Sequence, residues 1–175
     1  GFDDATQVVM VAFVPGERLA NLAHAGADPV ALCGRVGQWL AAFHGAREVT
    51  EAAFDARGPL RHVPEAAEYL PEAYTEARVR LAAQALALQG TRHRRAVLHG
   101  DLNASNLIVS GAVMTGIDFE NLHAHPALRD AGQVLAALHL RAAEAPGQIL
   151  PEPWRAAFEA AYGPCGALLD FFVLQ

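Results

Sequence analysis

A polar loop followed by a short apolar hairpin, residues 99–120 (HGDLNASNLIVSGAVMTGIDFE), constrains the fold more than any other part of this chain. Two apolar runs, 107–109 and 113–117, flank a Ser-Gly turn at 110–111 and predict two short antiparallel strands. Because a hairpin reverses the chain, the polar residues that precede it and those that follow it meet at one end of the ribbon.

The polar residues of this segment fit phosphoryl transfer. That reaction needs an acceptor hydroxyl held in place, its proton accepted, and the charge on the phosphate oxygens neutralised by a metal. A carboxylate near the acceptor serves the first two needs, and Asp101 is the candidate catalytic base. Magnesium prefers hard oxygen ligands and keeps several waters. Asn106 and Asp118 are therefore sufficient as its protein ligands.

Each of these residues also has a purely structural interpretation. Asp101 or Asn106 alone is more typical of a capped turn, whereas their combination with Asp118 favours an active site. We expect His99 to organise the loop by hydrogen bonding rather than to transfer a proton. Glu120 is either a support for the metal or a solvated carboxylate.

HGDLNASN followed by IDFE resembles the catalytic loop and metal-binding motif of the aminoglycoside phosphotransferase and choline kinase-like family, small-molecule relatives of protein kinases. Gly100 and Glu120 stand where protein kinases have Arg and Gly, which favours the small-molecule branch. The resemblance implies ATP and Mg²⁺ as cofactors, with the γ-phosphate transferred to a hydroxyl of a small molecule. It also implies an α+β, mostly helical fold, in which the large C-terminal lobe carries the motif on a small hairpin.

Two further segments fit the same resemblance. The run VVMVAFVPGERL resembles the family's hinge, a strand expected over residues 7–14. By this resemblance the Ala12 carbonyl and the Val14 N–H are the backbone groups that face adenine. Asp130 resembles the family's aspartate that braces the catalytic loop.

The chain departs from the family before residue 7. A complete member has a smaller N-terminal lobe that carries a phosphate-covering loop and a strand lysine, yet all 13 basic residues here are Arg. We expect the small lobe to be absent, so that the chain is either part of a longer kinase or a natural half-kinase. The alternative function is a non-catalytic half-kinase or pseudokinase that binds nucleotide or a partner. The uncovered strand 7–14 would then pair two copies in a homodimer or receive the missing lobe.

Length and charge narrow the class of protein. The 175 residues, 53% of them hydrophobic, predict a single domain over 1–175 with its own core. A net charge of −6 is not expected of a nucleic-acid binder. It weakly favours a cationic acceptor, which a negatively charged protein attracts. No apolar run reaches the length of a membrane span, and two cysteines form no disulfide framework. We therefore expect a cytoplasmic protein, whose acceptor the sequence leaves open among aminoglycosides, choline, homoserine, sugars and protein hydroxyls.

Apolar spacing predicts a mostly helical chain. Asp28-Pro29 is a helix start and Gly45 a helix stop, with His44 near the end of that helix against the catalytic loop or the core. The remaining expectations are helices at 17–24, 64–89 with a break at Pro71, from 130 onward, 154–162 and 166–174; a further strand at 96–98; loops at 46–62 and 121–129; and a solvated helix end at 92–95.

Overall fold

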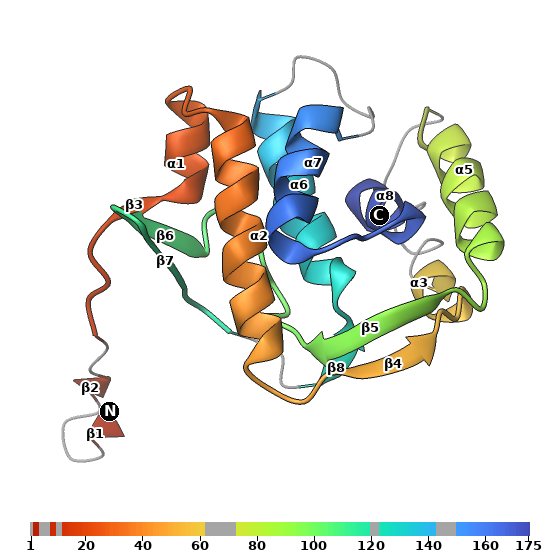
Figure 1. Ribbon diagram of the computed structural model, residues 1–175, viewed down its shortest axis with the longest axis horizontal. Coiled ribbons are helices and arrows are strands. Elements are labelled where there is room, and N and C mark those ends of the chain that lie inside the picture. The colour runs from red at the N-terminus through yellow and green to blue at the C-terminus, as the bar shows by residue number, and fades with distance from the viewer. Residues whose placement is uncertain (1, 4–7, 10–11, 62–72, 120–122, 143–149) are drawn as a thin grey trace.

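The computed structural model describes residues 2–3, 8–9, 12–61, 73–119, 123–142 and 150–175 (Figure 1). Its helices are α1 (Leu19–His24), α2 (Pro29–Gly45), α3 (Arg57–Arg61), α5 (Ala73–Ala87), α6 (Leu128–Ala142), α7 (Glu152–Tyr162) and α8 (Ala167–Leu174). Its strands are β1 (Phe2–Asp3), β2 (Val8–Val9), β3 (Glu17–Arg18), β4 (Thr50–Ala53), β5 (Arg92–Val97), β6 (Leu107–Ser110), β7 (Val113–Gly116) and β8 (Ala124–Pro126). The fold is α+β and mostly helical, as expected.

Helix α2 is the longest of the described helices and packs against the other helices of the larger core. It begins where the sequence predicts, because the Asp28 side chain accepts a hydrogen bond from the Val30 N–H at 3.0 Å and Pro29 occupies the first turn. One face of α2 packs along α7 and also meets α6 (Figure 1). The larger core lies between α1, α2, α6, α7 and β6, and a second core lies between α5, α8 and the segment after β4.

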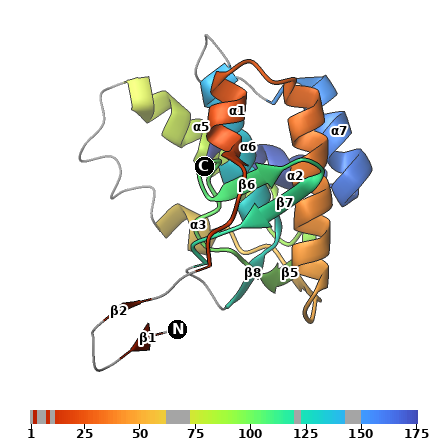
Figure 2. The ribbon, with the colours of Figure 1, turned by 90° about the vertical axis from the view of Figure 1, so that its left-hand side faces the viewer.

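Two three-stranded sheets frame the polar loop. In one, β3, β6 and β7 are antiparallel neighbours, and the β6–β7 hairpin turns at Gly111 with φ +56°, as the sequence predicts (Figure 2). In the other, β5 lies between β4 and β8. The chain leaves β5 at Val97 and returns as β8 at Ala124, so one sheet holds both ends of the segment that contains the loop and hairpin.

The prediction of a loop over residues 46–62 is wrong, because this segment contains β4 and α3. Strand β4 pairs antiparallel with β5, so the basic run 92–95 is a strand and not a helix end. An Arg92–Glu51 ion pair of 2.9 Å joins the two strands. Strand formation here depends on a partner that is distant in the sequence, and local propensity carries no signal of it.

The strand expected over 7–14 is confirmed at Val8–Val9, which form β2, and is wrong for residues 12–14, which belong to no strand. Residues 7, 10 and 11 lie outside the described residues. Residues 17–18, expected at the start of a helix, form β3 before α1 begins. The expected loop 121–129 contains β8 and the start of α6. Helix α5 confirms the later part of the helix predicted over 64–89, whereas residues 64–72 lie outside the described residues.

No single helix in the described ranges is long and apolar enough to cross a membrane. Helices α7 and α8 reach the length and apolar composition of a membrane span only when they are taken together, and the chain bends by 116° between them. Both helices place large side chains in the two cores, where Phe158 and Phe171 are at most 1% exposed.

Two glycines of α2 face α7 at different distances and test how closely these helices must approach. A Cβ on Gly37 would lie 2.7 Å from the Phe158 carbonyl oxygen, whereas one on Gly34 would lie 3.7 Å from that of Ala157. We expect Gly37→Ala to lower the free energy of unfolding by about 1–3 kcal/mol through overpacking. Gly34→Ala should leave it unchanged or raise it by up to about 1 kcal/mol. Urea denaturation of both variants measures this, and equal effects would contradict the predicted close packing.

Candidate active site

Asp101 lies in a loop that folds back on itself between β5 and β6. The Asn106 side-chain Nδ2 donates to the Asp101 backbone carbonyl at 2.9 Å and to its carboxylate at 3.3 Å. The Asn103 Nδ2 donates to the same carboxylate oxygen at 3.2 Å. The half-buried Asp101 carboxylate is therefore held by two amides from its own loop. Because the Asn106 amide turns its nitrogen to Asp101, its Oδ1 faces away and is able to bind a cation.

Asp118 reaches this loop through the hairpin. The Ile117 N–H donates to the Asn106 carbonyl at 3.0 Å, directly beyond the last paired residues of β6 and β7. Asp118 follows at once and has a φ of +63°, a left-handed conformation that costs an L-residue about 1–2 kcal/mol. Its side chain is exposed. The structure thus brings together the three residues that the sequence selects, Asp101, Asn106 and Asp118.

A buried carboxylate, Asp130 at the start of α6, holds the backbone just before Asp101. Its Oδ2 accepts the His99 N–H at 2.8 Å, and its Oδ1 accepts the Gly100 N–H at 3.4 Å. Gly100 has a φ of +97°, which turns the chain sharply at this point. Asp130 is 0% exposed, so its negative charge depends entirely on these donors and on one further partner, His44.

His44 and Tyr162 complete this buried network and connect it to α2 and α7. The His44 Nε2 lies 3.2 Å from the Asp130 Oδ2, and its Nδ1 lies 2.9 Å from the Tyr162 hydroxyl. Burial raises the pKa of Tyr162, so its hydroxyl stays protonated. In the tautomer with its proton on Nε2, the His44 ring accepts from Tyr162 at Nδ1 and donates to Asp130. Sequence reasoning places His44 near the loop or core but contains no signal for Tyr162, because no local motif links the two.

His99 connects the loop to the end of the hairpin. Its Nε2 donates to the Ile117 carbonyl at 2.8 Å, and its ring lies 4.5 Å, centroid to centroid, from that of Phe119. Phe119 also lies 5.5 Å from the Phe43 ring of α2. This cluster fixes the backbone on both sides of Asp118 by hydrogen bonding and aromatic packing.

No contact with this cluster is seen for Ala12 or Val14 among the described residues. Ala12 and Val14 belong to the irregular stretch before β3, and Glu120 lies outside the described residues. Within the described ranges no three His, Cys, Asp or Glu side chains gather around a common point where a metal could bind. A magnesium site of Asn106 and Asp118 does not need such a cluster, because water supplies the remaining ligands.

Comparison with known proteins gives one family. A family model described as phosphotransferase enzyme family matches residues 4–172, and no curated protein matches the chain. Among solved structures, crystal form B of a glucosamine kinase has a TM-score of 0.55 at 20% identity, covering 88% of this chain and 44% of that one. Crystal form A has a TM-score of 0.53 at 21% identity, covering 88% and 42%.

A third structure is a glucosamine kinase in complex with glucosamine, ADP and inorganic phosphate. It has a TM-score of 0.53 at 20% identity and covers 88% of this chain and 45% of its own. The present chain therefore spans less than half the length of these kinases. At this level of identity the likeness shows a shared fold.

The Asp130 network predicts a large stability effect from a small substitution. Asp130→Asn replaces one carboxylate oxygen by an amide that cannot accept from the facing N–H groups. We expect a loss of about 1–3 kcal/mol in the free energy of unfolding, measured by chemical denaturation. Asp28→Asn is the matched control: it keeps an exposed helix cap and should change stability by less than about 0.5 kcal/mol. An Asp130→Asn protein with the same free energy of unfolding as wild type would contradict the importance of this network.

Proposed function

The chain belongs to the phosphotransferase enzyme family, and from that premise we propose that it transfers the γ-phosphate of ATP to a hydroxyl of a small molecule with the help of Mg²⁺. One observation carries the proposal: the loop and hairpin place Asp101, Asn106 and Asp118 at one end of a short ribbon. This set supplies one base and two oxygen ligands, which is what phosphoryl transfer requires of a protein.

In the proposed reaction Asp101 accepts the proton of the acceptor hydroxyl as that oxygen attacks the γ-phosphorus. The amides of Asn103 and Asn106 orient the carboxylate by donating to one of its oxygens. The second oxygen is then free of these two amides and faces the acceptor. Positioning of this kind, together with proton acceptance, is typical of kinase catalytic loops.

Asn106 Oδ1 and the Asp118 carboxylate would hold the magnesium ion. When bound, the ion neutralises charge on the phosphate oxygens. The fit rests on two features of the structure, the outward Oδ1 of Asn106 and the exposed carboxylate of Asp118. Asp118 has a left-handed backbone conformation, and we propose that this strained geometry is retained for metal binding.

We further propose that the chain is the C-terminal lobe of the kinase and that its residues 12–14 contact adenine through the Ala12 carbonyl and the Val14 N–H. Phe13 between them is 88% exposed, as expected of an apolar side chain that another lobe or a second copy covers. The chain contains no lysine. The lysine that binds nucleotide phosphates in kinases would therefore come from that covering lobe.

Asp101→Asn tests the proposed base. We expect ATP turnover with acceptor to fall at least about 100-fold, because an amide cannot accept the hydroxyl proton, while Mg²⁺–ATP binding stays unchanged. Coupled ADP release measures turnover, calorimetry measures binding, and Asp28→Asn serves as the exposed control. Wild-type turnover in Asp101→Asn would refute the assigned role.

Asp118→Asn tests the metal site separately. Loss of the carboxylate charge should weaken the magnesium-dependent part of ATP binding about tenfold. In a thermal-shift assay with ATP, the stabilisation that Mg²⁺ adds should therefore be smaller for the variant than for the wild-type chain. A wild-type chain that binds ATP equally well with and without Mg²⁺, and shows no turnover, would favour the alternative of a non-catalytic nucleotide-binding module.

A further inference from the structure

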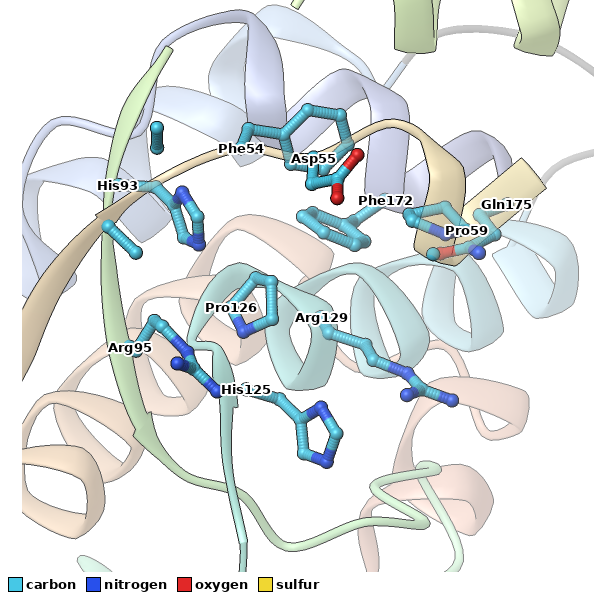
Figure 3. Close-up of a pocket in the computed structure, with 13 residues that line it drawn as sticks. Phe54, Asp55, Pro59, His93, Arg95, His125, Pro126, Arg129, Phe172 and Gln175 are labelled. Atoms are coloured by element: carbon cyan, nitrogen blue, oxygen red, sulfur yellow. The ribbon is translucent and has the colours of Figure 1, made fainter. Parts of the chain in front are cut away.

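A cavity of about 380 Å³ lies beside the β4-β5-β8 sheet, between that sheet and the helices α3 and α8 (Figure 3). Its volume is within the range of pockets that bind small molecules. The residues that line it come from the strands, from the first turn of α6 and from the end of α8. We call this cavity the basic pocket.

One wall of the basic pocket is cationic. Arg95 of β5 and Arg129 of α6 both line it, and Figure 3 shows their guanidinium groups on either side of His125. Arg95 also donates to the Ala124 carbonyl, which fixes its guanidinium at the wall. Among the side chains of the described lining residues Asp55 supplies the one carboxylate, and it forms an ion pair of 2.8 Å with Arg57. The pocket is therefore locally positive although the whole chain is negative.

Two histidines add hydrogen-bonding groups to this wall. Burial and the neighbouring Arg95 lower the pKa of His93, with the Thr91 backbone acting in the opposite sense. Burial, Arg129 and Arg95 lower the pKa of His125. Both rings are thus neutral near pH 7. Each neutral ring carries one N–H that can be donated to an anion.

The His93 ring is a second and independent sign of a ligand. It points into the pocket in Figure 3, and both of its ring nitrogens are buried without a hydrogen bond of ordinary geometry among the described residues, although the Thr91 backbone lies near enough to raise its pKa. Buried polar atoms in folded proteins are almost always paired. A ligand oxygen in the pocket would satisfy one of them.

The basic pocket lies on the elements that position the catalytic loop. Arg129 immediately precedes Asp130, which holds the backbone N–H groups of His99 and Gly100. His125 of β8 lies opposite Ala96 of β5, three residues before His99. The basic pocket therefore shares β5, β8 and the first turn of α6 with the segment that holds the Asp101 loop in place.

The opposite side of the pocket is mainly apolar but also carries the Asp55 carboxylate. Phe54, Pro59 and Phe172 face the arginines across the cavity in Figure 3. A ligand with an anionic group at one end and a carbon skeleton at the other matches both walls. A cationic amino group beside the two arginines would be repelled by them, and the Asp55 carboxylate on the other side is already paired with Arg57.

We propose that the basic pocket binds the carboxylate or phosphate of the acceptor, so that this kinase phosphorylates a small hydroxyl-bearing anion and not an amino sugar. This inference rests on the proposed function. The net charge of the chain weakly favours a cationic acceptor, and the basic pocket favours an anionic one. We follow the pocket, because the local charge at a site, and not the net charge of the protein, decides which ligand binds.

Four probes on one sugar skeleton test the inference: glucose, glucosamine, gluconate and glucose 6-phosphate. Calorimetric titration of the whole chain without ATP should show gluconate or glucose 6-phosphate binding at least tenfold more tightly than glucose or glucosamine. The comparison of gluconate with glucose 6-phosphate shows whether the pocket prefers a carboxylate or a phosphate. Equal binding of all four, or tighter binding of glucosamine, would overturn the inference, as would the absence of binding by both anions.

Variants locate the binding. Arg129→Gln should weaken the preferred anion at least fivefold, and Arg129→Lys should recover part of that loss because it restores the charge. The matched control is Arg92→Gln, whose residue lies on the same sheet outside the pocket and pairs with Glu51. Circular dichroism checks that each variant is folded. An Arg129→Gln protein that binds the anion as wild type does would place the site elsewhere and contradict the inference.

A separate turnover assay distinguishes the two proposals. Suppose that an anion binds in an Arg129-dependent way but no phosphoryl transfer occurs, either with this chain alone or with an added N-terminal lobe. That result would contradict the proposed function, and the pocket would remain an anion-binding site. Phosphoryl transfer to glucosamine with no preference for anions would contradict the basic pocket and leave the proposed function intact.

Discussion

The buried Asp130 carboxylate is the interaction on which the rest of the site depends. A buried charge is tolerated only where its partners are in place, and here they come from the backbone of His99 and Gly100 and from the ring of His44. Because Tyr162 in turn bonds His44, one carboxylate joins α6, α2, α7 and the catalytic loop. The loop cannot move without breaking this network, so its conformation is set by the helical body.

The two small sheets position the polar residues of the site relative to this network. The β6–β7 hairpin returns Asp118 to Asn106, while β5 and β8 hold the two ends of the intervening segment. The same β5–β8 pairing builds the cationic wall of the basic pocket. The Asp101 loop and the basic pocket thus share one support, the paired strands β5 and β8.

Parts of the fold with local causes follow from the sequence. Helix α2 begins at the predicted cap because Asp28 binds an N–H two residues away. The hairpin forms around Gly111, whose positive φ an L-residue rarely adopts. The same reasoning fails for β4 and for the basic run 92–95. A strand that pairs with a partner some forty residues away leaves no pattern of its own when neither strand alternates between apolar and polar residues.

The sequence by itself determined the candidate catalytic group and its spacing. Asp101, Asn103 and Asn106 contact one another within a single loop, so their order along the chain is sufficient to place them together. Only the tertiary structure decided the partners of Asp130 and the walls of the basic pocket. His44 and Tyr162 are 118 positions apart, and the pocket draws on strands and helices from both halves of the chain. Packing of the helices creates these contacts, and no local sequence pattern encodes them.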